Sequence, residues 1–171
     1  MIRAIRALIA VVAVGVLASC GGGDSLQPSQ TYQGPPITQV VVKKGDRKMY
    51  LVSGKEVVKS YSVNLGNQPV GPKRFEGDGR TPEGLYFIDR FNPHSRYHLS
   101  VGISYPSAQD VANAASMGLR PGGDIFIHGL GPEGRALNRP DWTAGCIAVT
   151  DEEIEEIFTM LRPGVPVFIY P

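Results

Sequence analysis

The stretch Trp142-Thr143-Ala144-Gly145-Cys146-Ile147-Ala148-Val149 places a thiol directly after a glycine and before a short apolar run. Gly145 permits a tight turn, so Cys146 is expected to be presented at the start of a strand. The N–H groups of Gly145 and Cys146 are then expected to face the oxyanion of a tetrahedral intermediate. This arrangement is typical of a nucleophile, and the alternative is a cysteine that serves only as a small buried hydrophobic residue.

A second segment, Asp124-Ile125-Phe126-Ile127-His128-Gly129, is expected to form a buried strand that ends in a histidine. A thiol with an ordinary pKa of about 8.5 is only slightly ionised at neutral pH, so chemistry at Cys146 requires a neighbouring base. His128 is the best-placed candidate, and Gly129 or its carbonyl group is expected to hold the imidazole tautomer. A lone His or a lone Cys is more often structural, but together they favour a catalytic pair.

The rest of the chain shows alternating polar and apolar residues with turn residues between the runs. These runs predict short strands, the first three in an antiparallel meander, at residues 38–43, 48–52, 57–65, 85–88 and 165–170. Glycines and prolines concentrated in residues 66–84 predict a long irregular loop, a type of segment that often carries function.

Two helices are predicted from capping boxes. Ser107 with Asp110 begins one that ends at Gly118, and Thr150 with Glu153 begins one that ends before Pro163. The sequence therefore predicts a mainly β domain over residues 37–171 with two short helices.

The composition is that of one globular domain with a short extension. The chain has 171 residues, of which 42% are hydrophobic and 19% charged, and its net charge is +1. It contains no run of Lys and Arg, so nothing in it would attract a nucleic-acid backbone over a distance.

The N-terminus has the pattern of a secretory signal peptide over residues 1–19. Arg3 and Arg6 precede an apolar stretch at 7–18. This stretch is shorter than the roughly 20 residues that span a bilayer, so it is expected to be removed.

The sequence Leu17-Ala18-Ser19-Cys20 resembles the bacterial lipoprotein box, which implies that Cys20 carries lipid. Residues 20–36 are rich in Gly, Pro and polar residues and are expected to form a flexible tether. The expected location is the periplasm, and by the same resemblance the lack of an Asp directly after Cys20 implies an anchor on the outer rather than the inner membrane. The alternative is an exported chain without lipid. If Cys20 is lipidated, Cys146 has no disulfide partner, and a free thiol in an oxidising compartment implies a use.

His128-Gly129 followed by Thr143-Ala144-Gly145-Cys146 resembles the signature of the L,D-transpeptidase catalytic-domain family (YkuD type). The resemblance covers residues 37–171 and implies a β-sandwich-like catalytic domain that acts on peptidoglycan stem peptides. Cys146 would attack the carbonyl between the L-centre of diaminopimelate and D-alanine and form a thioester, with His128 as general base and then general acid. An amine of a neighbouring stem would resolve the thioester, whereas water would make the enzyme a hydrolase. No metal or organic cofactor is implied.

The chain departs from the usual family pattern at two positions beside the nucleophile. Ala144 and Ala148 stand where many members have His and Arg. This variant subgroup includes amidases that release proteins from peptidoglycan. Transfer and hydrolysis are therefore both open, and a hydrolase would be an L,D-carboxypeptidase or an amidase. A third and different alternative is a lipid-anchored module that binds the wall and has an inert Cys146.

Several further residues are candidates for the site. Thr143 is expected to orient the nucleophile, and the substrate-binding candidates are Arg80, Tyr97, Ser100 and Trp142. Trp142 is equally explained as a core residue, and Arg80 as a solvated surface residue. Tyr97 is expected on a strand, and His94 in a surface turn around Pro93.

Overall fold

The computed structural model describes residues 32–171 except residue 138. The predicted signal peptide and the predicted lipid attachment site at Cys20 lie outside these residues. In the described part, eight strands form one sheet in the order β3-β2-β1-β8-β4-β5-β6-β7. The strands are β1 (Gln39–Lys43), β2 (Lys48–Ser53), β3 (Glu56–Ser62), β4 (Gly84–Ser95), β5 (His98–Ile103), β6 (Phe126–His128), β7 (Ile147–Ala148) and β8 (Pro166–Tyr170).

The predicted meander of the first three strands is confirmed, because β1 pairs with β2 and β2 with β3 in antiparallel fashion. Parallel pairing occurs between β1 and β8 and between β6 and β7. The closing strand thus returns to the first strand, while the strand that ends in His128 lies next to the strand that follows Cys146.

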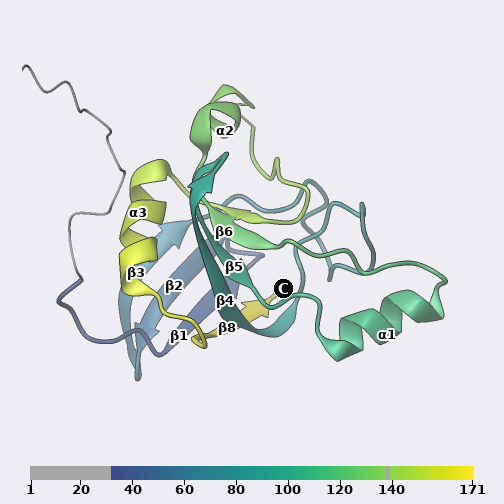
Figure 1. The fold of residues 1–171 in the computed structure, drawn as a ribbon, viewed down its shortest axis with the longest axis horizontal. Helices are drawn as coiled ribbons and strands as arrows, with labels where there is room; N and C mark the ends of the chain where they lie inside the picture. Colours follow the sequence, from purple (N-terminus) through teal and green to yellow (C-terminus); the bar gives the residue numbers. More distant parts are fainter. Residues whose placement is uncertain (1–31, 138) are drawn as a thin grey trace, which may run out of the picture.

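The long strand β4 joins the two halves of the sheet. Its residues 84–87 pair with β8, and its residues 88–95 pair with β5. Irregularities in register between Ile88 and Arg90 and between Asn92 and Ser95 accompany this change of partner, as β-bulges do where a strand bends. The two halves cross in Figure 1, with α3 (Asp151–Met160) alongside them. The architecture is the mainly β, sandwich-like fold that was predicted.

Both predicted helices are confirmed with their capping boxes. Ser107 caps α1 (Ala108–Ser116) and Thr150 caps α3. The prediction of only two helices was wrong, because a third helix, α2 (Gly131–Leu137), follows β6. Glycine is a poor helix former, so the two glycines of α2 give no helical pattern, while a proline in the first turn of a helix loses no hydrogen bond.

The core lies between the halves of the sheet and α3. Ile154, Ile157 and Met160 are the buried residues of α3, and the Tyr61 hydroxyl on β3 donates a hydrogen bond to Glu156 Oε2 at 2.8 Å. Helix α1 buries only Ala114 and lies away from the sheet (Figure 1). None of the helices in the described residues is both long and apolar enough to cross a membrane.

Candidate active site

Cys146 lies immediately before β7, behind a turn that only glycine tolerates. Gly145 has φ of 140°, and a Cβ atom there would lie 2.7 Å from the carbonyl oxygen of Arg80. The Thr143 hydroxyl donates to the Cys146 carbonyl at 2.7 Å and accepts the Gly145 N–H at 3.1 Å. Thr143 therefore braces the turn that presents the thiol.

His128 reaches the same side of the sheet as Cys146 because of the strand register. In the parallel ladder Ile127 lies opposite Ile147, so Cys146 lies level with Phe126. Side chains alternate along a strand, so His128, two residues after Phe126, projects from the same face as Cys146. Both side chains line one cavity of about 360 Å³.

The imidazole of His128 is held on several sides. Its Nδ1 lies 2.6 Å from the carbonyl oxygen of Gly129, which can only accept, so Nδ1 carries the proton and Nε2 keeps its lone pair. The Tyr97 ring stacks on the imidazole with centroids 4.5 Å apart, and the Trp142 ring meets it edge-on at 5.7 Å. Gly129 must lack a side chain, since a Cβ there would lie 2.5 Å from Asp151 Oδ1.

Burial keeps both members of the pair neutral. It lowers the pKa of His128, against the opposing effect of the Gly129 hydrogen bond. It also raises the pKa of the Cys146 thiol, although the Phe126 N–H and the Lys73 charge oppose this. A thiol beside a neutral imidazole is an arrangement in which the base removes the proton during attack, rather than a preformed thiolate–imidazolium pair.

Cys146 separates two cavities of different character. The 360 Å³ cavity, which we call the aromatic cavity, is lined by Asn92, Ser95, Arg96, Tyr97, Ser100, Asp124, Phe126, His128 and Cys146. The other, which we call the glycine-rich cavity, measures about 280 Å³ and is lined by Asn67, Lys73, Glu76, Gly77, Gly79, Gly122, Gly123, Asp124, Ile125, Ala144 and Cys146. A substrate can therefore approach the sulfur from two sides.

A family model for the L,D-transpeptidase catalytic domain (YkuD) matches residues 37–169. The chain belongs to this family. The family modifies peptidoglycan by acting on its stem peptides, and its members are generally periplasmic.

Individual relatives agree with this assignment. YafK of Escherichia coli (strain K12), which carries the name of an L,D-transpeptidase, is 28% identical over 187 residues, covering 99% of this chain and 70% of YafK. The helical cell shape determining protein Pgp2 from Campylobacter jejuni is 26% identical with a TM-score of 0.62, over 81% of this chain and 49% of that one. This chain therefore spans about half the length of Pgp2. An L,D-transpeptidase from Xylanimonas cellulosilytica is 15% identical with a TM-score of 0.51, over 82% and 63% of the two chains, and shares the fold.

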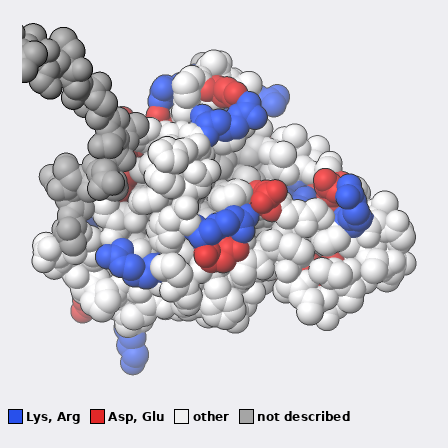
Figure 2. Space-filling model, viewed as in Figure 1, with Lys and Arg blue, Asp and Glu red and all other residues white. Residues whose placement is uncertain are grey.

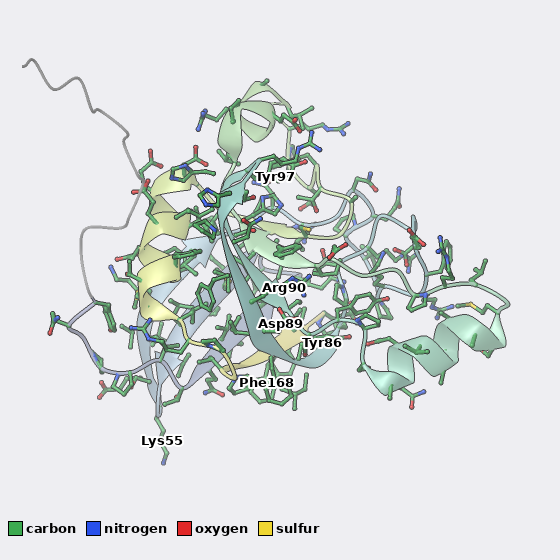
Figure 3. The ribbon with its side chains drawn as sticks, viewed as in Figure 1. Lys55, Tyr86, Asp89, Arg90, Tyr97 and Phe168 are labelled. Carbon is green, nitrogen blue, oxygen red and sulfur yellow. The ribbon has the colours of Figure 1, made fainter. Side chains whose placement is uncertain are left out.

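Several residues named from the sequence meet in this L,D-transpeptidase domain. Ser100 on β5 lies opposite His128 in the ladder and lines the aromatic cavity, as does Tyr97. Tyr97 is in the turn between β4 and β5, not on a strand as predicted, and lies at the α2 end of this hairpin in Figure 3. Trp142 is buried against His128 and does not line either Cys146 cavity.

Two expectations need correction. The Arg80 side chain lines neither Cys146 cavity, and its Nη1 would lie 2.8 Å from a Cβ at Gly71. Its backbone carbonyl instead supports the Gly145 turn. The Gly145 N–H is also not free, since it donates to Thr143, whereas the Cys146 N–H has no acceptor among residues 32–137 and 139–171. The Cys146 N–H is therefore the better placed oxyanion donor.

Sequence reasoning missed Lys73 and Asp124, which line the cavities beside Cys146. Lys73 lies within the irregular loop that was singled out, where no local pattern distinguishes it. Asp124 was expected at the start of a strand, but that strand, β6, begins only at Phe126. The Asp124 carbonyl oxygen lies 3.5 Å from the sulfur, and its exposed carboxylate pairs with Arg90. In the part of the chain that the structure describes, no group of three or more His, Cys, Asp or Glu side chains is placed to hold a metal ion.

Replacing Tyr97 by Ala is expected to shift the acid limb of the pH–kcat/KM profile to higher pH. The stacked ring contributes to the burial that lowers the pKa of His128, so removing it lets water return and raises that pKa. More of the imidazole is then protonated, and inactive as a base, at mildly acidic pH. The loss at neutral pH should stay below about tenfold, because Nε2 itself is unchanged. Tyr97→Phe, which keeps the ring, should retain the wild-type profile, and an unshifted limb in Tyr97→Ala would contradict this role.

Proposed function

We propose that this chain is a peptidoglycan L,D-transpeptidase that uses Cys146 to form a thioester with a donor stem peptide and transfers it to an amine acceptor. One observation carries the proposal: the Cys146 thiol lines the same cavity as the His128 imidazole, whose tautomer the Gly129 carbonyl fixes. The direction of both pKa changes, lowered for His128 and raised for Cys146, agrees with general-base activation of the thiol. Family membership supports the same chemistry on stem peptides.

The first half-reaction follows from these positions. His128 Nε2 accepts the thiol proton while Sγ attacks the carbonyl between the L-centre of diaminopimelate and D-alanine. The Cys146 N–H lies on the nucleophile itself and can donate to the oxyanion that forms. As the C–N bond breaks, the imidazolium returns the proton to the departing D-alanine nitrogen, leaving a thioester and a neutral imidazole.

In the second half-reaction His128 serves again as base. It takes a proton from the attacking amine, whose nitrogen bonds to the thioester carbon, and the thiolate leaves and recovers that proton. Water in place of the amine gives a free stem tripeptide. Ala144 and Ala148, where the common signature has His and Arg, are the reason that hydrolysis is retained as the second candidate.

Product analysis tests the proposal. The full chain is incubated with a tetrapeptide muropeptide, and the products are separated and weighed. Crosslinked dimers with released D-alanine are the expected result. Tripeptide with released D-alanine would instead indicate a carboxypeptidase. No release of D-alanine under reducing conditions would reject both the transpeptidase and the carboxypeptidase, and release of wall-linked protein from peptidoglycan sacculi would then identify an amidase.

We also propose that the protein acts in the periplasm from a lipid anchor at Cys20, most naturally on the outer membrane. The lipoprotein box and the polar segment at 20–36 support this. Cells that express the wild-type protein should incorporate labelled fatty acid into it, and the Cys20→Ala variant should not be labelled. Equal labelling of the wild type and the variant would contradict the lipid anchor.

A further inference from the structure

Lys73 is a buried cation beside the nucleophile, and the Cys146–His128 pair does not account for it. It belongs to the irregular segment between β3 and β4, and only 4% of its side chain is exposed. It lines the glycine-rich cavity together with Cys146. Buried lysines are rare unless they are paired, so the contacts of this ammonium group decide what it does.

Two of the three N–H groups on Lys73 Nζ have acceptors. One donates to Asp78 Oδ1 at 2.9 Å and one to the carbonyl oxygen of Phe75 at 3.1 Å. An ammonium group offers three donors, and across the described residues no third acceptor lies in range. A buried donor that stays unsatisfied is costly, so this N–H favours an anionic or polar ligand in the cavity.

Asp78 holds the Lys73 ammonium in place but occupies only one of its three N–H donors. Its carboxylate also accepts the backbone N–H groups of Arg74 at 2.6 Å, Phe75 at 3.3 Å and Arg80 at 3.1 Å. Burial alone would raise the pKa of Asp78, but these donors and Lys73 together lower it. Asp78 is therefore ionised at neutral pH, and its carboxylate, which accepts from four donors, holds the ammonium in place.

The other carboxylates that line the glycine-rich cavity have cations of their own. Glu76 pairs with Arg120 at 2.9 Å, and Asp124 pairs with Arg90 at 3.1 Å. Figure 3 labels Arg90 on β4, next to Asp89. Lys73 also borders a larger hollow next to α1, but that hollow does not contain Cys146. Lys73 and Cys146 both line the glycine-rich cavity, so the ammonium and the sulfur border the same space. The positive charge of Lys73 opposes the rise in the thiol pKa that burial causes.

We propose that Lys73 binds the free carboxylate of the D-alanine residue that leaves when Cys146 attacks the donor stem peptide. This inference rests on the proposed function and names a specificity residue for it. The carboxylate is separated from the scissile amide nitrogen by a single carbon, so its binding group must border the same cavity as the thiol. The cavity of about 280 Å³ suits a residue as small as alanine. Its walls leave room for a ligand, because a Cβ at Gly77 or Gly123 would meet nothing within 4 Å.

The test compares a tetrapeptide donor with the same peptide ending in a carboxamide. For wild type, kcat/KM for release of the terminal residue should be about 10- to 100-fold higher with the carboxylate, the size of one buried charged hydrogen bond. Lys73→Met should remove most of this preference, chiefly by slowing the carboxylate substrate. Because Lys73→Met leaves Asp78 without its ammonium partner, the variant Lys73→Met/Asp78→Asn is measured beside it, with thermal unfolding of both.

Lys55→Met is the matched control, since Lys55 is exposed in the turn between β2 and β3 and points away from the body in Figure 3. It should keep the wild-type preference. An equal rate of wild type on the two substrates would overturn the inference while leaving the proposed function standing, and this comparison requires no variant. An equal loss on both substrates in the lysine variants would also overturn it. Failure of wild type to release the terminal residue from either peptide would instead overturn the proposed function, and the inference with it.

Discussion

Replacement of Cys146 by Ala is expected to lower the rate of D-alanine release by about 10⁴-fold or more and to abolish the covalent adduct. Without sulfur there is no thioester, so the reaction cannot be divided into two easier steps. The measurement is the mass of the intact protein after incubation with a tetrapeptide muropeptide or a carbapenem under reducing conditions. Wild type should gain one acyl group, and Cys146→Ala none.

The matched control is Cys20→Ala, which removes the other cysteine of the chain and should keep the adduct. Cys146→Ser should fold but react far more slowly, because a hydroxyl is much harder to deprotonate than a thiol. If Cys146→Ala retained full biological activity, the chain would instead be a wall-binding lipoprotein with an inert cysteine.

Loss of activity in Cys146→Ala should not reflect unfolding. The Cys146 side chain is not fully buried, and the hydrogen bond that its thiol donates, to the Asp124 carbonyl oxygen, is long at 3.5 Å. The free energy of unfolding is therefore expected to change by no more than about 1 kcal/mol, which chemical denaturation can measure. In the view of Figure 2 the charged side chains of the described residues lie in small groups, several of them of both signs, and no large patch of one charge covers this face.

Local signals allowed much of the fold to be predicted. The capping boxes of Ser107 and Thr150 act within a single turn, and the structure contains both. The alternation that predicted the first strands also reflects neighbouring residues, since successive side chains face opposite sides of a strand. These features depend little on the rest of the chain.

Long-range features could not be predicted in the same way. Pro93 suggested a turn, but β4 continues through it because a register irregularity between Asn92 and Ser95 removes the need for a hydrogen bond from proline. The turn of this hairpin is instead at Arg96 and Tyr97. Its position depends on pairing with β5, which the local sequence does not reveal.

The residues of the candidate site likewise fall into those that local sequence predicts and those that only tertiary contacts place. Cys146 and His128 were identifiable because each stands beside a glycine, Cys146 at the start of an apolar run and His128 at the end of one. Lys73 and Arg80 lie in the segment between β3 and β4, whose path is set by contacts such as the Lys73–Asp78 ion pair and the approach of Arg80 to Gly145. The loop was correctly singled out as a whole, but which of its cations faces the cavity depends on tertiary structure.

Replacement of His128 by Gln is expected to lower kcat/KM by about 10²- to 10⁴-fold at neutral pH and to change the shape of its pH profile. In wild type the acid limb follows protonation of His128, whose pKa burial lowers from its ordinary value of 6.5, so activity should persist to mildly acidic pH and fall below that. The variant has no base and must use the thiolate. Burial raises the thiol pKa above its ordinary value, so the remaining rate should climb about tenfold per pH unit through the neutral range. The deficit of His128→Gln therefore shrinks as the pH rises.

His94→Gln, at an exposed position on β4, is the matched control and should keep the wild-type profile. A parallel profile in His128→Gln, reduced by the same factor at every pH, would show that His128 is not the base that activates Cys146.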